Sequence, residues 1–133
     1  MEARPFRVLL LLGGLVLLFV ALPVGYYVYV KRVAGQKAEV LGVDWNASRT
    51  CSVTTYIPSL GVESVSSRFF HLFSSSAFFR VHDAQGRRLR SSEWILWQQE
   101  VDDEPPRWVG DGQVIYPTTS GYEAWAIPEC VRD

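Results

Sequence analysis

Residues 8–30 read VLLLLGGLVLLFVALPVGYYVYV, contain no charged side chain, and are followed at once by Lys31 and Arg32. An α-helix rises about 1.5 Å per residue, so this stretch covers about 34 Å, enough to cross a hydrocarbon core of about 30 Å. Three tyrosines near its end are typical of the aromatic belt at a membrane surface. The stretch predicts a single transmembrane helix and makes the rest of the chain a membrane-tethered domain.

A cleaved signal peptide is the alternative to an uncleaved signal-anchor. The apolar run is longer than the roughly 7 to 15 residues usual in signal peptides. Lys31 and Arg32 also stand where a cleavage site requires small residues. We therefore expect a cytoplasmic N-terminus over residues 1–7, a signal-anchor over 8–30, a short polar linker over 31–37 and an extracytoplasmic domain over 38–133.

The charge of the chain is divided between its two parts. Residues 1–37 carry five Lys and Arg against one Glu, and these basic residues flank the apolar run, where anionic lipid headgroups favour them. Residues 38–133 carry eight Arg against thirteen Asp and Glu, a balance of −5. Nucleic-acid binding depends on neutralising phosphates. The acidic domain is therefore a poor candidate for it.

The two cysteines, Cys51 and Cys130, lie at either end of the domain and suit a disulfide in an oxidising compartment. Two unrelated buried thiols in a cytosolic domain are the alternative. Counting Lys and Arg on either side of the span weakly favours a cytoplasmic domain. The short basic N-terminus and the cysteine pair favour the opposite side. Arg replaces Lys after Lys37, which is typical of GC-rich bacteria, so we expect a single-pass protein of the bacterial inner membrane with its domain in the periplasm.

The domain reads mainly as strands, because apolar residues alternate with polar ones at a period of two. Residues 83–86 and 110–112 have the composition of turns. Residues 93–97 are apolar on both faces and predict a strand that is central in the sheet or lies under a cover. The sequence therefore predicts a mainly β fold, a small antiparallel β-sandwich or open barrel of six to seven strands. The expected strands cover residues 41–46, 51–57, 77–82, 87–91, 93–97, 114–116 and 122–127.

Residues 59–73 admit two interpretations. Apolar residues recur there at helical spacing and favour one short amphipathic helix. The Ser-rich surroundings leave a strand or loop as the alternative. The apolar positions concerned are Val62, Val65, Phe69 and Leu72 or Phe73.

No motif specifies a reaction, and we predict no catalytic residue, no metal ligand and no cofactor. The two histidines, His71 and His82, belong to no zinc-binding spacing. A Gly-x-Ser-x-Gly nucleophile elbow is missing from the sequence. Asn46-Ala47-Ser48 matches the glycosylation acceptor pattern, which matters only in a eukaryotic secretory pathway.

A surface for a protein partner is the remaining expectation. In strand geometry one ring of each adjacent Phe pair points away from the core. Aromatic and Arg side chains dominate protein–protein contacts, and an acidic loop steers a basic partner. Rings that simply fill a two-sided core are the alternative. The candidate partner-binding residues are Phe70, Phe78, Asp102, Asp103, Glu104, Arg107 and Trp108.

In layout the chain resembles small inner-membrane proteins of Gram-negative bacteria that bind one protein in the periplasm. Immunity proteins against secreted antibacterial effectors are one such group, and no shared motif accompanies the resemblance. It implies a protein-binding module that contacts the lipid bilayer through residues 8–30 and has one protein partner, a toxin in the immunity case. The alternative is a structural accessory subunit of an envelope complex, whose span packs against other membrane helices.

Overall fold

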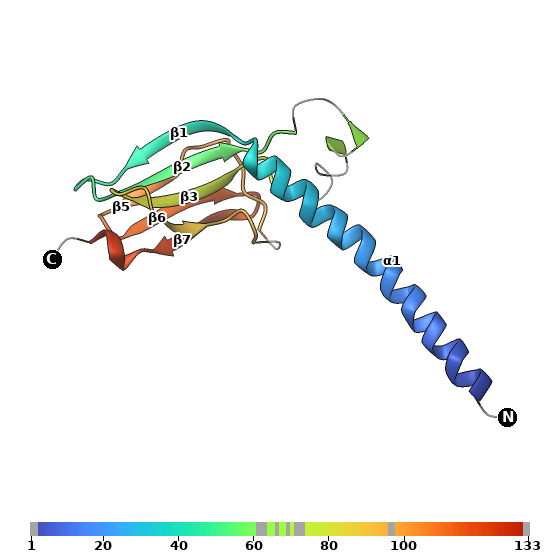
Figure 1. The fold of residues 1–133 in the computed structure, drawn as a ribbon. Coiled ribbons are helices and arrows are strands. Elements are labelled where there is room, and N and C mark those ends of the chain that lie inside the picture. Colours follow the sequence, from blue (N-terminus) through green and yellow to red (C-terminus); the bar gives the residue numbers. More distant parts are fainter. Residues whose placement is uncertain are drawn as a thin grey trace.

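The computed structural model describes residues 3–60, 64–65, 67–68, 70, 74–95 and 98–131. A long helix leads into a β-rich domain at one end of the molecule (Figure 1). The elements in chain order are α1 (Ala3–Gln36), β1 (Glu39–Trp45), β2 (Cys51–Ile57), β3 (Phe78–Asp83), β4 (Arg88–Ser91), β5 (Arg107–Val109), β6 (Gln113–Thr118), β7 (Gly121–Ala126) and the 3-10 helix η1 (Pro128–Cys130).

Helix α1 is one continuous element of 34 residues that passes through Pro23. Its apolar side chains before Tyr26 are exposed, and its length and composition are consistent with a single-pass membrane anchor or a signal sequence. The helix also includes residues 31–36, for which we expected a polar linker. It continues because Val30 and Ala34, four residues apart on one face, pack with Leu60 and Phe70 of the domain.

The strands form two antiparallel sheets, in the orders β1-β2-β3-β4 and β5-β6-β7. Both sheets are open within the described residues, which form no closed barrel. The predicted 77–91 hairpin is confirmed. Its turn places Gly86 at φ +81°, and the Asp83 carboxylate accepts hydrogen bonds from the backbone N–H groups of Gln85 and Arg87. A backbone at positive φ favours glycine, so Gly86 fits this position.

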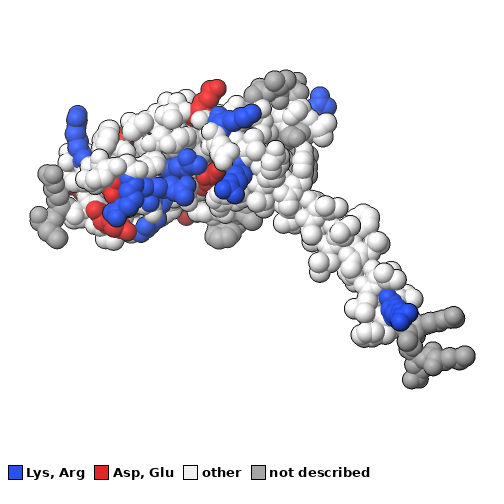
Figure 2. Space-filling view, viewed as in Figure 1, with Lys and Arg blue, Asp and Glu red and all other residues white. Residues whose placement is uncertain are grey.

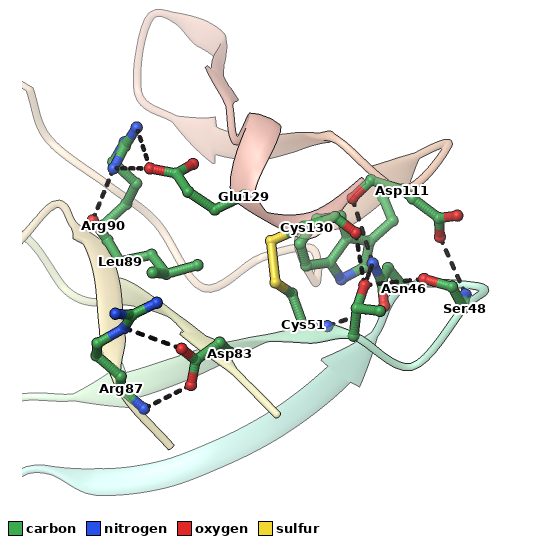
Figure 3. The surroundings of a disulfide bond; sticks show 12 residues. Asn46, Ser48, Cys51, Asp83, Arg87, Leu89, Arg90, Asp111, Glu129 and Cys130 are labelled. Atoms are coloured by element: carbon green, nitrogen blue, oxygen red, sulfur yellow. Dashed lines mark hydrogen bonds and ion pairs between the residues drawn. A yellow bond between two sulfur atoms is a disulfide. The ribbon is translucent and has the colours of Figure 1, made fainter. Parts of the chain in front are cut away.

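One hydrophobic cluster joins the two sheets. It contains Val53, Phe79 and Val81 of the four-stranded sheet, together with Val114 and Tyr116 of β6. The Phe79 and Tyr116 ring centroids lie 5.2 Å apart. The structure contains the predicted disulfide, which joins Cys51 at the start of β2 to Cys130 in η1 beside this cluster (Figure 3). The core and the disulfide therefore hold the same two layers together.

The central strand predicted over residues 93–97 is wrong for its described part. Glu93 and Trp94 form a turn, Ile95 is irregular, and residues 96–97 lie outside the described residues. Ser92 ends the pairing with β3, since its N–H donates to the Phe79 carbonyl and its hydroxyl accepts from the Phe79 N–H. The next strand in the chain, β5, belongs to the other sheet and is a strand that we did not expect.

The short helix expected over residues 59–73 is partly described. Val65, Ser67, Arg68 and Phe70 are helical, and the Arg68 N–H donates to the Ser64 carbonyl. Val65 is exposed, so it does not contribute to a buried apolar face. The other predicted apolar positions, Val62, Phe69, Leu72 and Phe73, lie outside the described residues.

Removing the disulfide should strongly destabilise the domain. The cysteines are 79 positions apart, and a loop of this size gives about 4 to 5 kcal/mol in the chain-entropy model. We expect the C51A/C130A variant to lose that much free energy of unfolding in urea titrations of the full chain in detergent. Dithiothreitol-treated wild type should match the variant. An unchanged unfolding midpoint would contradict this prediction.

Candidate partner-binding surfaces

Phe70 and Phe78, which we expected to be exposed, are buried. Their exposed fractions are 3% and 4%. Phe70 lies beneath the last turns of α1 with Val30 and Ala34. The Phe78 ring stacks on Tyr56 with centroids 5.1 Å apart. The expectation that these two rings are exposed is wrong, because the helix end covers one and neighbouring side chains cover the other.

The acidic loop that contains Asp102, Asp103 and Glu104 is exposed, as is Arg107 at the start of β5. The Tyr122 hydroxyl donates to the Glu104 carboxylate at 2.8 Å, and the Arg107 guanidinium lies 5.9 Å from the Tyr122 ring centroid. The hydrogen bond to Glu104 raises the pKa of Tyr122. The structure therefore brings two of the predicted residues together and adds Tyr122, which we did not predict.

Trp108 lies apart from this group and has a structural role. Its ring packs partly buried against the core, and its indole N–H donates to the Asp44 carbonyl at 3.0 Å. This bond ties β5 of one sheet to β1 of the other. The predicted candidates therefore separate into an exposed set, formed by the acidic loop and Arg107, and a set that stabilises the fold.

Among the described residues of the domain, β1 carries more exposed large apolar side chains than any other strand. Four of its side chains are about half exposed or more: Val40 at 57%, Leu41 at 60%, Val43 at 48% and Trp45 at 49%. We call these four residues the β1 strip. The strand pairs only with β2 in its sheet, so it forms one edge. Sheet edges usually carry features that block pairing with another chain, and exposed apolar patches mark interaction sites.

The apolar side chains of β1 are exposed. The alternation of residues 41–46 predicted a strand and named no inward face. Asp44 pairs with the core residue Val53 instead, so Asp44 and Gly42, which are both partly buried, face inward. An irregularity in the register between Val40 and Gly42 places Leu41 outside the regular pairing. Alternation identified a two-faced strand but could not identify the buried face.

Asn46, which sequence analysis treated as a glycosylation acceptor, is a buried structural residue. It is 2% exposed, its side-chain amide donates to Thr50 Oγ1 and to the Asp111 carbonyl, and its Oδ1 accepts from the Cys51 N–H (Figure 3). Thr50 in turn donates to the Cys130 carbonyl. The 46–50 turn is thereby fixed to the opposite sheet beside the disulfide.

Basic side chains spread across the face of the domain seen in Figure 2, and the β3–β4 hairpin contributes Arg80, Arg87, Arg88 and Arg90. Arg87 pairs with Asp83 and Arg90 with Glu129. Partial burial, together with the positive charges of Arg80 and Arg88, lowers the pKa of His82. The net charge of the domain did not indicate this basic group, because it sums these arginines with acidic residues elsewhere in the domain.

The described residues present surfaces rather than a substrate-sized enclosed pocket. A cavity of about 20 Å³, lined among others by Lys31, Phe70 and Glu100, lies where α1 meets the domain and has room for one water molecule. Within the same part of the chain, three or more His, Cys, Asp or Glu side chains do not gather as metal ligands. Comparisons with protein-family models, curated proteins and solved structures found no match.

Stability should fall as pH decreases through the titration range of histidine. The folded pKa of His82 lies below its ordinary value of 6.5, so the unfolded chain binds a proton more readily than the folded chain. The stabilisation is present above 6.5 and is lost as the unfolded imidazole becomes protonated. We expect a lower urea midpoint about one unit below pH 6.5 than about one unit above it. The H82N variant should show a smaller difference between the two urea midpoints. A difference as large as that of the wild type would contradict the assignment to His82.

Proposed function

We propose that the chain is a membrane-anchored protein-binding module whose β domain stands in the periplasm and contacts one protein partner through the β1 strip. The observation that carries this proposal is the exposure of four large apolar side chains on an edge strand. A peptide strand can add to such an edge through main-chain hydrogen bonds, with neighbouring side chains supplying specificity. A partner that covers the β1 strip would also remove its apolar side chains from water, which is favourable.

The position of β1 supports an encounter with another protein rather than with lipid. In Figure 1 β1 runs along the upper margin of the domain, whereas α1 leaves toward the lower right. A partner can therefore reach the strip from the side away from the apolar part of α1. The exposed loop at residues 102–104 provides a separate acidic surface that would steer a basic partner.

The disulfide supports a periplasmic domain, because disulfides persist in oxidising compartments. Within this proposal, the layout favours an immunity or inhibitor protein that blocks a secreted antibacterial effector. The alternative, a structural accessory subunit of an envelope complex, would use the span for its main contacts. The two functions differ in which part of the chain touches the partner.

Photo-crosslinking in intact cells separates these functions. A photoreactive residue at Leu41 or Val43 should give one discrete adduct with a second protein. Val109 of β5, which is 50% exposed, is the matched control and should give none. Adducts confined to a probe in the span, at Leu17, would favour the accessory subunit and overturn the binding role of the β1 strip.

A charged substitution in the strip should weaken the contact. V43K places an ammonium group in an apolar interface, and we expect about a fivefold or greater loss of the Leu41 adduct, since a residue that carries binding energy costs more than about 1 kcal/mol when it is replaced. V109K is the control and should leave the adduct unchanged. An undiminished adduct with V43K would contradict the proposed contact.

Thiol trapping tests the compartment. Acid-quenched cells treated with a maleimide polymer should show no mobility shift of the chain until a reductant is added, because Cys51 and Cys130 are bonded. A cytosolic control protein should shift without reductant. Two freely reactive thiols in quenched cells would place the domain in a reducing compartment and refute the periplasmic assignment.

A further inference from the structure

A groove lies between the last turns of α1 and the outer face of the four-stranded sheet. Its volume is about 500 Å³, and α1 contributes Val28, Arg32 and Gln36 to its wall. Arg80, Arg88 and Trp94 line the opposite side. Gly35 permits the close approach, because a Cβ at this position would collide with Glu93 Oε1. The groove is thus built jointly by the helix and the domain.

The groove carries excess positive charge. Arg32, Arg80 and Arg88 face one acidic residue, Glu93, so the formal balance is +3 − 1 = +2. Glu93 is already engaged by Arg80, with Nη2 and Oε2 2.6 Å apart. Among the described residues neither Arg32 nor Arg88 forms an ion pair. Two exposed guanidinium groups therefore remain available for an anion, in the fork geometry that suits phosphate.

The position of the groove along α1 indicates which anion it meets. Val28 belongs to the uncharged stretch, and Gln36 ends the helix, so the wall spans about 12 Å along the axis. A headgroup layer adds about 5 to 7 Å on each side of the hydrocarbon core. The groove therefore begins at the edge of the core and covers the full depth of the headgroups, given the anchoring that is part of the proposed function.

Aromatic contacts at the rim agree with this depth. Trp94 is 46% exposed, and the Lys31 ammonium lies 5.3 Å from its ring centroid and 5.9 Å from that of Tyr27. Trp and Tyr favour the boundary between hydrocarbon and water. The remainder of the domain is acidic, so an anionic membrane surface attracts this face and repels the others.

We propose that this groove binds the phosphate of an anionic phospholipid headgroup through Arg32 and Arg88 and thereby fixes the orientation of the domain on the membrane. Arg80 contributes positive potential while it remains paired with Glu93. The site is independent of the β1 strip, so loss of lipid binding and loss of the protein partner are separate results.

Lipid titrations of the full chain in detergent test the proposal. Native mass spectrometry would count bound phosphatidylglycerol and, in a parallel series, zwitterionic phosphatidylcholine. Each basic residue near an anionic surface contributes a factor of about five, so R32Q/R88Q should bind phosphatidylglycerol about thirtyfold more weakly. R32K/R88K keeps both charges but loses the guanidinium fork, so it should bind phosphatidylglycerol more tightly than R32Q/R88Q and more weakly than wild type. R49Q/R107Q removes two exposed arginines elsewhere and should change binding less than about twofold.

Three results would overturn the proposal. The first is equal binding of phosphatidylglycerol and phosphatidylcholine. The second is a loss of phosphatidylglycerol binding in the R49Q/R107Q control that equals the loss in R32Q/R88Q. The third is binding of inorganic phosphate in the groove with an affinity equal to that of the lipid, so that phosphate displaces the lipid. The first would remove anionic selectivity, the second would reduce the effect to net charge, and the third would make free phosphate the ligand. Thermal unfolding of each variant should match wild type, which separates lost binding from lost folding.

Discussion

The last turns of α1 pack into the domain, and much of the arrangement depends on this contact. Val30 and Ala34 lie against Leu60 and Phe70, and the Ser59 N–H donates to the Ala34 carbonyl. Gly35 lets the helix approach Glu93 closely. These contacts bury the apolar face that continues beyond the uncharged stretch. They also decide which side of the four-stranded sheet lies beside the helix and which edge stays free.

The domain is small, and several modest interactions between its two sheets hold them together. Tyr116 fills the centre, and burial raises the pKa of its hydroxyl to about 12 while that hydroxyl donates to Gln98 Oε1. Asn46 and Trp108 each supply a hydrogen bond from one sheet layer to the other. The disulfide adds a covalent link at the same end as Asn46. Polar bridges and apolar packing therefore reinforce one another at this end of the domain.

Much of this organisation could be predicted from local patterns. An uncharged stretch long enough to cross a bilayer, a strand period of two, and a turn ending in Gly86 are properties of neighbouring residues. The cysteine pairing could also be predicted, because only one pair exists. Which segment packs against a buried face depends on the tertiary structure, however, and local sequence patterns do not show it. Nothing near β1 in the sequence shows that the Asp44 backbone carbonyl accepts a hydrogen bond from the Trp108 indole N–H. Nor does it show that α1 covers Phe70. Pairing of β3 with β4 brings Arg80 close to Arg88 and Arg90, which are already near one another in the sequence.

The absence of a loose connection after residue 30 has a mechanical consequence. Helix and domain form one continuous unit, so under the proposed function a protein bound to β1 would be held at a fixed height above the bilayer and would not sample a wide volume. Tilting of the helix would move β1 sideways, and a force applied at β1 would act on the helix as a torque. The proposed binding role therefore implies a partner that arrives within a narrow layer close to the membrane.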